Sequence, residues 1–209
     1  MWNEECGVRS VECGVRRALR NFSLFTFHFS LLTFLFSCQS DAYHIQGYAR
    51  QLNQNDTICI VLENEPERML GKAIVNDGKF SVTGHTDTIL FCKAYLNRMK
   101  NCNVDFMLEP GNITLELNLP PKPSRTSGTK LNNQWQQLND SIQRMGTKLI
   151  NLVVSAKTPA DEVTHQARLQ AIDSLHRRMS DCIVNTARRN ADNPLGQYIE
   201  KNYKAPEFK

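Results

Sequence analysis

Apolar and polar residues alternate with a period of two from Tyr43 to residue 119, and this alternation predicts β-strands. Residues 56–63, DTICIVLE, carry apolar side chains on both faces, which predicts a central strand. Asn76-Asp77-Gly78 supplies the positive φ angles of a tight hairpin turn. The region contains about seven such segments, and their short connections leave no room for crossover helices. We therefore expect an antiparallel meander, folded as a β-sandwich or an open barrel.

The period changes after a Pro-rich stretch at residues 120–129, whose prolines cannot donate hydrogen bonds to a sheet. Two helical stripes follow, and Thr158 is the expected N-cap of the second helix. The first stripe consists of Leu131, Trp135, Leu138, Ile142, Met145, Leu149 and Leu152. The second consists of Leu169, Ile172, Leu175, Met179, Cys182 or Ile183, and Thr186. Such stripes are usually core, although they could also form a partner surface.

The sequence thus predicts the α+β class, with an antiparallel β domain followed by a helical hairpin. The β domain is expected at residues 43–119, the connector at 120–129 and the helical segment at 130–203. A short last helix is expected from Asn193, and residues 204–209 form a tail.

The first 37 residues have the character of an export signal. Arg16, Arg17 and Arg20 precede an apolar run at residues 22–37, which is the order of the charged and apolar regions of a signal peptide. A helix that spans a bilayer needs about 20 apolar residues, so this run is short for a permanent anchor. We expect residues 1–37 to be a signal peptide with an atypical N-terminal extension. An uncleaved anchor is the alternative.

Cys38 follows this run directly, in the context Leu35-Phe36-Ser37-Cys38. The context resembles the lipobox of Gram-negative bacterial lipoproteins, although Phe36 replaces the usual small residue. The resemblance implies cleavage before Cys38, acylation of its thiol and a tether at residues 38–42. Several acyl chains anchor a protein durably, whereas a single chain binds only marginally. By the same resemblance, Gln39 in place of Asp after the cysteine favours the outer membrane, with the protein facing the periplasm. Alternatively, Cys38 is a small buried apolar residue.

Charge and composition change this picture little. The chain has a formal net charge of +4, and only +3 remains after the four basic and three acidic residues before Cys38 are removed. Such a small surplus does not indicate a nucleic-acid partner.

The sequence contains no recognisable catalytic, cofactor-binding or metal-binding constellation. It has seven cysteines but no Cys-x-x-Cys pair, and its histidines lack ligands at metal-site spacing. Cys92 and Cys102 would face each other if their strands paired about Asn97. They are expected to form either a structural disulfide or two buried thiols.

Three segments carry a further likeness: GKFSVTG, FMLEPGNITLEL and SGTKLNNQW, in that order. Together they resemble the N-terminal domain of unknown function found in many Gram-negative lipoproteins. In those proteins the domain usually precedes a thioredoxin-like domain of the thiol–disulfide interchange or peroxiredoxin type. The likeness extends over residues 43–203, and the catalytic cysteines of the redox domain have no counterpart here.

We therefore expect a non-enzymatic outer-membrane lipoprotein that acts as a binding or scaffold module. Its partners would be the membrane, through acylated Cys38, and another protein or a small ligand. The alternative is a truncated or accessory relative of a thiol–disulfide interchange protein, working with a separate thioredoxin-like protein.

Overall fold

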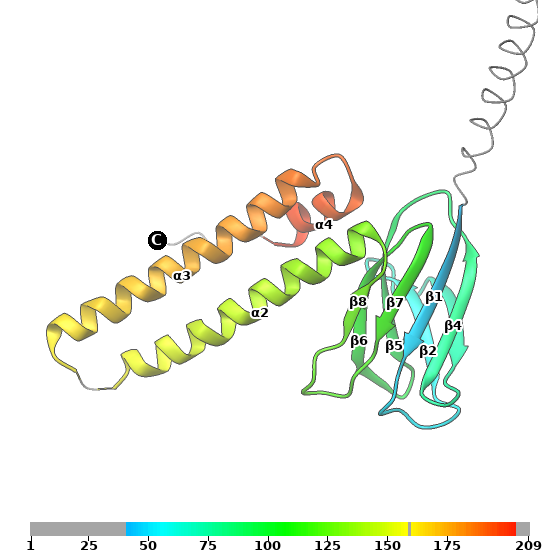
Figure 1. The fold of residues 1–209 in the computed structure, drawn as a ribbon, viewed down its shortest axis with the longest axis horizontal. Coiled ribbons are helices and arrows are strands. Elements are labelled where there is room, and N and C mark those ends of the chain that lie inside the picture. The colour runs from blue at the N-terminus through cyan, green and yellow to red at the C-terminus, as the bar shows by residue number, and fades with distance from the viewer. Residues whose placement is uncertain (1–40, 159, 204–209) are drawn as a thin grey trace, which may run out of the picture. The chain divides into compact units, whose positions relative to one another are not determined.

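The computed structural model describes residues 41–158 and 160–203. Within them the chain forms eight strands followed by three helices (Figure 1). The strands are β1 (Ala42–Tyr48), β2 (Thr57–Leu62), β3 (Met69–Ile74), β4 (Lys79–His85), β5 (Leu90–Leu96), β6 (Met99–Leu108), β7 (Gly111–Glu116) and β8 (Arg125–Ser127). The helices are α2 (Lys130–Ala156), α3 (Glu162–Arg189) and α4 (Pro194–Asn202). The α+β class and the sandwich-like arrangement are confirmed.

The strands form two four-stranded sheets. Sheet A has the order β4-β1-β7-β8, and sheet B has the order β3-β2-β5-β6. The central position of β2 confirms the expectation from its two apolar faces. The expected simple meander is wrong, because β1 and β7 pair in parallel, with Ile45 opposite Ile113. The connection between these two strands passes through the whole of sheet B, so a parallel pair forms without a crossover helix.

The turn at Asn76–Lys79 has the predicted chemistry but joins two different sheets. Asp77 and Gly78 have φ angles of 50° and 68°, and Asn76 and Lys79 form a bridge. Beyond this bridge the strands diverge, because β3 pairs with β2 and β4 pairs with β1. The turn therefore closes one end of the sandwich and does not make a two-stranded hairpin.

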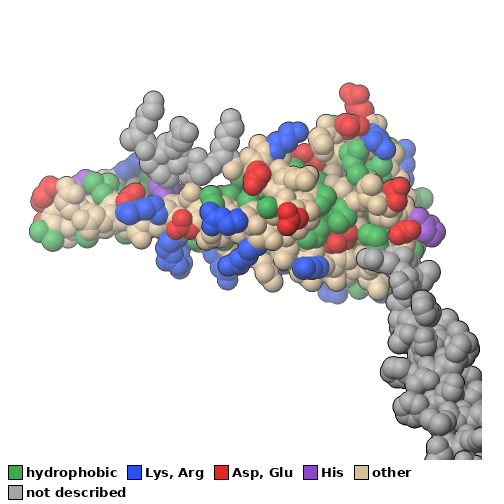
Figure 2. Space-filling model, turned by 90° about the horizontal axis from the view of Figure 1, so that it is seen from above, with side chains coloured by type: hydrophobic (Ala, Val, Ile, Leu, Met, Phe, Trp, Pro, Cys, Tyr) green, Lys and Arg blue, Asp and Glu red, His purple; other side chains and the backbone are tan. Residues whose placement is uncertain are grey.

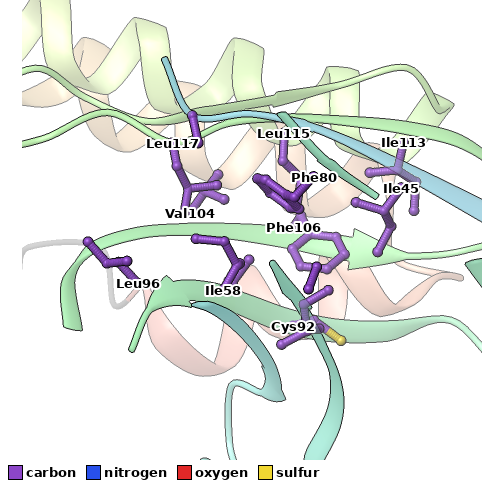
Figure 3. Packing of buried hydrophobic residues seen from close by; sticks show 14 of the residues in the cluster. Ile45, Ile58, Phe80, Cys92, Leu96, Val104, Phe106, Ile113, Leu115 and Leu117 are labelled. Atoms are coloured by element: carbon purple, nitrogen blue, oxygen red, sulfur yellow. The ribbon is translucent and has the colours of Figure 1, made fainter. Parts of the chain in front are cut away.

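A hydrophobic core fills the space between the sheets. Figure 3 shows side chains of sheet A meeting side chains of sheet B across this space. Ile45, Ile113 and Leu115 come from sheet A and are fully buried. Phe106 and Ile58 come from sheet B and are fully buried too. The period-two alternation explains this arrangement, because every second residue of a strand points to the same face.

A second core lies between the outer face of sheet B and the helices. Phe91 of β5 contacts Trp135 of α2 edge to face, with ring centroids 5.2 Å apart, and stacks on Tyr198 of α4. Trp135 also meets Tyr198 edge to face. Leu195 and Ile199 of α4 are fully buried in the same cluster. The helices thus cover part of sheet B and join it through apolar burial.

α2 and α3 run side by side as the expected antiparallel pair (Figure 1). The predicted N-cap of the second helix is wrong: Asp161, not Thr158, caps α3, and its carboxylate accepts the N–H of Thr164 at 2.9 Å. The stripe of α2 is buried from Leu131 to Leu138. Further along the helix its members are only half-buried, and Ile150 is exposed.

Candidate binding surface

Two of the predicted site residues lie inside the sandwich, and the third lies outside the described residues. Cys38, the expected lipidation site, falls in the part of the chain that is not described. Cys92 and Cys102 are both buried and both free. Of the two alternatives for this pair, the structure has the two buried thiols.

The register of β5 and β6 explains why Cys92 and Cys102 do not meet. Cys92 lies opposite Phe106, because a register shift follows the pair of Tyr95 and Asn103. Phe106 is four residues from Cys102, which corresponds to roughly 13 Å along a strand. A disulfide needs Cα atoms within about 7 Å, so the expected facing geometry is wrong.

The environments of Cys92 and Cys102 disfavour the thiolate form of each side chain. Burial raises the pKa of the Cys92 thiol to about 12. Burial also raises the pKa of the Cys102 thiol, whose Sγ contacts the carbonyl of Asn118 at 3.3 Å. Thiol–disulfide exchange requires an accessible thiolate, which these environments disfavour.

The outer face of sheet A, in contrast, is open and polar. Along β1 the alternation turns Ile45 into the core and His44 and Gln46 outward. Gln46 lies opposite Ser81 on β4 and Thr114 on β7, which forms a polar row across three strands. We call this surface the open face of sheet A and define it by His44, Gln46, Ser81, Thr83, Asn112 and Thr114. Five of these residues are exposed and Thr114 is half-buried.

A hollow adjoins the open face where β1 and β4 meet the turn at Asn76. Its walls combine hydrogen-bonding groups with the exposed apolar side chain of Ile74. The lining residues are His44, Gln46, Ile74, Asn76, Lys79, Phe80 and Ser81. Amide, imidazole, hydroxyl and ammonium groups together can donate and accept hydrogen bonds to a polar ligand.

One edge of this face carries an ion pair that ties the sheet to α2. Arg125 of β8 donates two hydrogen bonds to the Asp140 carboxylate, at 2.9 and 2.6 Å. These bonds hold the pKa of Asp140 below its ordinary value. Glu116 lies opposite Arg125 in the sheet, so this edge carries acidic and basic side chains together. On the face seen in Figure 2, acidic and basic side chains are likewise interspersed.

A second charged group lies on the outer face of sheet B, beside the aromatic cluster. Lys93 is 3.4 Å from Glu63 and 3.6 Å from Asp105. Oδ1 of Asp105 is buried and, among the described residues, has no hydrogen-bond partner. Burial raises the pKa of Asp105, and the ammonium group of Lys93 only partly offsets this effect. Sequence reasoning did not identify this group, because Asp105 occupies an ordinary outward position in an alternating strand.

The described residues contain no cluster of three or more metal-binding side chains. None of the described helices combines the length and the apolar character that crossing a bilayer requires. The side chains of the open face are amides, hydroxyls and an imidazole, which can donate and accept hydrogen bonds.

Comparisons with known proteins complete this description. No curated protein matches the chain. Among solved structures, the CBM25-1 of a beta/alpha-amylase from Paenibacillus polymyxa matches with a TM-score of 0.28 and 9% identity, covering 44% of this chain and 94% of that one. A family model described as "Domain of unknown function (DUF4369)" matches residues 43–135, which include the sandwich and the start of α2. Residues 43–135 are therefore similar to this family of unknown function.

Proposed function

We propose that this protein is a non-enzymatic outer-membrane lipoprotein, anchored through acylated Cys38, whose sandwich acts as a periplasmic binding or scaffold module. The observation that carries the binding role is the asymmetry between the two sheets. The helices cover part of sheet B, whereas the open face of sheet A keeps its polar side chains exposed. An uncovered polar sheet face can recognise a partner through hydrogen bonds and local shape.

The thiols support a role without redox catalysis. Cys59, Cys92 and Cys102 are buried, and burial raises the pKa of two of them. An insulin-reduction assay with the purified protein tests this point. We expect no turnover above the uncatalysed rate, and measurable turnover would contradict the proposal.

The anchor is tested by Cys38→Ser. Without a thiol at this position no acyl chain can be attached, so the variant is expected to move from the detergent phase to the aqueous phase of a detergent separation. The matched control is Cys182→Ser, which removes a half-buried thiol of α3 and should leave the partitioning unchanged. If Cys38→Ser stays in the detergent phase, acylation does not hold the protein at the membrane.

The open face is tested by Gln46→Arg. Gln46 is exposed at the centre of the polar row, so the larger charged side chain should block binding without disturbing the core. Thr147→Arg makes the same change at an exposed position of α2 and is the control. Partners cross-linked in cells are identified by mass spectrometry. A partner that is lost with Gln46→Arg and kept with Thr147→Arg supports the proposal, and a thioredoxin-like protein in that position would indicate the accessory role. A partner set that neither variant changes would contradict binding through this face.

A further inference from the structure

The two sheets have four edge strands, and α2 seals two of them. Asn132 bonds both backbone groups of Met107 at the edge of β6, at 2.9 and 2.7 Å. The indole N–H of Trp135 bonds the carbonyl of Asp105 on the same strand at 3.1 Å. At the edge of β8, the N–H of Thr126 is satisfied by the side chain of Gln136 at 2.8 Å. Helix α2 thus protects this side of the sandwich from pairing with another chain.

The edge of β3 is blunted by its own sequence. The pairing of β3 with β2 shifts register between Ile60 and Val61, which is a bulge. Lys72 is exposed in the middle of the strand. A bulge and a central lysine are two common devices that prevent edge-to-edge pairing.

The edge of β4 has neither device. Its seven residues pair with β1 in continuous register, from Lys79 opposite Tyr48 to His85 opposite Ala42. The strand contains no proline, and its one charged side chain, Lys79, lies at the start. β4 is therefore a regular and uncovered edge among the described strands.

The hydrogen bonds at both ends of this pairing show which backbone groups of β4 point outward. The N–H of Ala49 bonds the carbonyl of Gly78, and the N–H of Thr86 bonds the carbonyl of Asp41. Hydrogen-bonded pairs alternate along an antiparallel ladder, so the even-numbered residues of β4 bond to β1. The odd-numbered residues point their N–H and C=O groups to the free edge. The N–H and C=O groups of Lys79 bond to Asn76 in the turn. The outward backbone groups that are available to another strand are therefore those of Ser81, Thr83 and His85.

We propose that the β4 edge is the interface of a homodimer, in which a second copy pairs antiparallel with β4 about a two-fold axis at Thr83. The three residues with outward backbone groups are symmetric about Thr83. Thr83 then faces Thr83 of the other copy, and Ser81 faces His85. These pairs supply about six backbone hydrogen bonds. Sheet A becomes a continuous eight-stranded sheet.

The side chains fit the same register. On the outer face, Thr–Thr and Ser–His pairs meet, and cross-strand hydroxyl pairs are favourable. On the inner face Val82 meets Gly84, so a branched side chain lies beside a residue without one. Lys79 of one copy comes level with Asp87 of the other, and both residues are exposed in the single chain. Two opposite-charge pairs thus flank the axis, whereas the same operation at β3 would bring the two Lys72 side chains close together.

The register is tested by Thr83→Cys in the full chain, oxidised in intact cells. The Cα atoms of a hydrogen-bonded antiparallel pair are about 5.5 Å apart, which matches disulfide geometry. We expect a disulfide-linked dimer joined at residue 83 in peptide mapping. Asn112→Cys, exposed on β7 of the same face, is the control and should not cross-link. A monomeric Thr83→Cys protein under oxidation would overturn the proposal.

The backbone pairing is tested by adding Ser81→Pro to Thr83→Cys. The N–H of Ser81 points to the free edge, so proline removes a donor for the second copy without removing a bond to β1. We expect the cross-linked fraction to fall at least about tenfold, since two hydrogen bonds and close approach are lost. An unchanged dimer would overturn the β4 pairing. If the double variant does not fold, the single Thr83→Cys result decides. Neither arm uses partner capture or acylation, so failure here is separate from failure of the proposed function.

Discussion

The side chain of Asn132 bonds to the backbone of Met107 as a neighbouring strand would. Its Nδ2 donates to the Met107 carbonyl at 2.7 Å, and its Oδ1 accepts the Met107 N–H at 2.9 Å. Asn132 is fully buried. Its Oδ1 also accepts a hydrogen bond from the hydroxyl of Thr126 at 3.0 Å, and its Nδ2 also donates one to the hydroxyl of Thr129 at 2.7 Å. One side chain of α2 therefore joins β6, β8 and the helix start in a single buried network.

Replacing Asn132 by Leu should destabilise the protein strongly. The change introduces an apolar side chain of similar size and leaves two buried backbone groups of Met107 without partners. Each such group costs about 1–3 kcal/mol, so we expect a loss of about 2–6 kcal/mol in the free energy of unfolding. Chemical denaturation measures this loss. Gln137→Leu, at an exposed position of α2, is the control and should change stability by less than about 0.5 kcal/mol.

The alternation of residues predicts which strands form, because burial of one face is a local property of the sequence. It does not predict which strands pair. The turn at Asp77-Gly78 forms as predicted. The strands on either side of it nevertheless enter different sheets, because β3 pairs with β2 and β4 pairs with β1. The short strand β8 lies within the predicted connector, because three residues are too few to show a period.

The site was predictable to a similar degree. The outward positions of β1 and β4 follow from the alternation, but the open face of sheet A does not, because it depends on the pairing of β4, β1 and β7. The position of Cys102 does not, because Leu96 pairs with Met99 whereas Tyr95 pairs with Asn103. This shift leaves residues 100–102 outside the pairing, and nothing in their side chains indicates it. The role of Asn132 depends on where α2 meets β6, which is a tertiary contact.

The cysteines should differ in their reactivity. Cys92 and Cys102 are fully buried, whereas Cys182 of α3 is half-buried. With iodoacetamide under native conditions we expect Cys182 to be alkylated first and Cys92 to remain unmodified. Peptide mapping measures the order. In denaturant both residues of the sandwich should be alkylated without prior reduction. A requirement for reductant would mean that they are linked in the native protein.

Tyr198 should be needed to hold α4 against sheet B. Its ring stacks on Phe91 and meets Trp135 edge to face at 5.7 Å between centroids. Tyr198→Ala removes both contacts, and we expect a loss of about 3 kcal/mol and a red shift of the Trp135 fluorescence as water reaches the indole. Tyr198→Phe keeps the ring and should preserve the emission maximum. An unshifted spectrum for the alanine variant would show that α4 does not depend on this ring.

Asp105 and Asp140 should give the stability of the protein opposite dependences on pH. Burial raises the pKa of Asp105 above its ordinary value of 3.8. The folded state therefore binds this proton more tightly than the unfolded state. The resulting stability is present below pH 3.8 and is lost as the pH rises through the folded-state pKa. Asn cannot ionise, so Asp105→Asn should gain stability relative to the wild type between pH 4 and pH 7. Lys93 keeps Glu63 as a partner at 3.4 Å in this variant.

Asp140→Asn provides the matched control, because the hydrogen bonds from Arg125 lower the pKa of Asp140. Its stabilising contribution is present above pH 3.8 and is lost as the pH falls through the folded-state pKa. The stability deficit of Asp140→Asn should thus be largest at pH 7 and shrink on acidification. Urea denaturation of both variants and the wild type, repeated from pH 4 to pH 7, measures the two slopes. If the stability difference between variant and wild type changed with pH in the same direction for both variants, burial would not be the main influence on the pKa of Asp105. Lys93 would then stabilise the charged form of Asp105 as Arg125 stabilises that of Asp140.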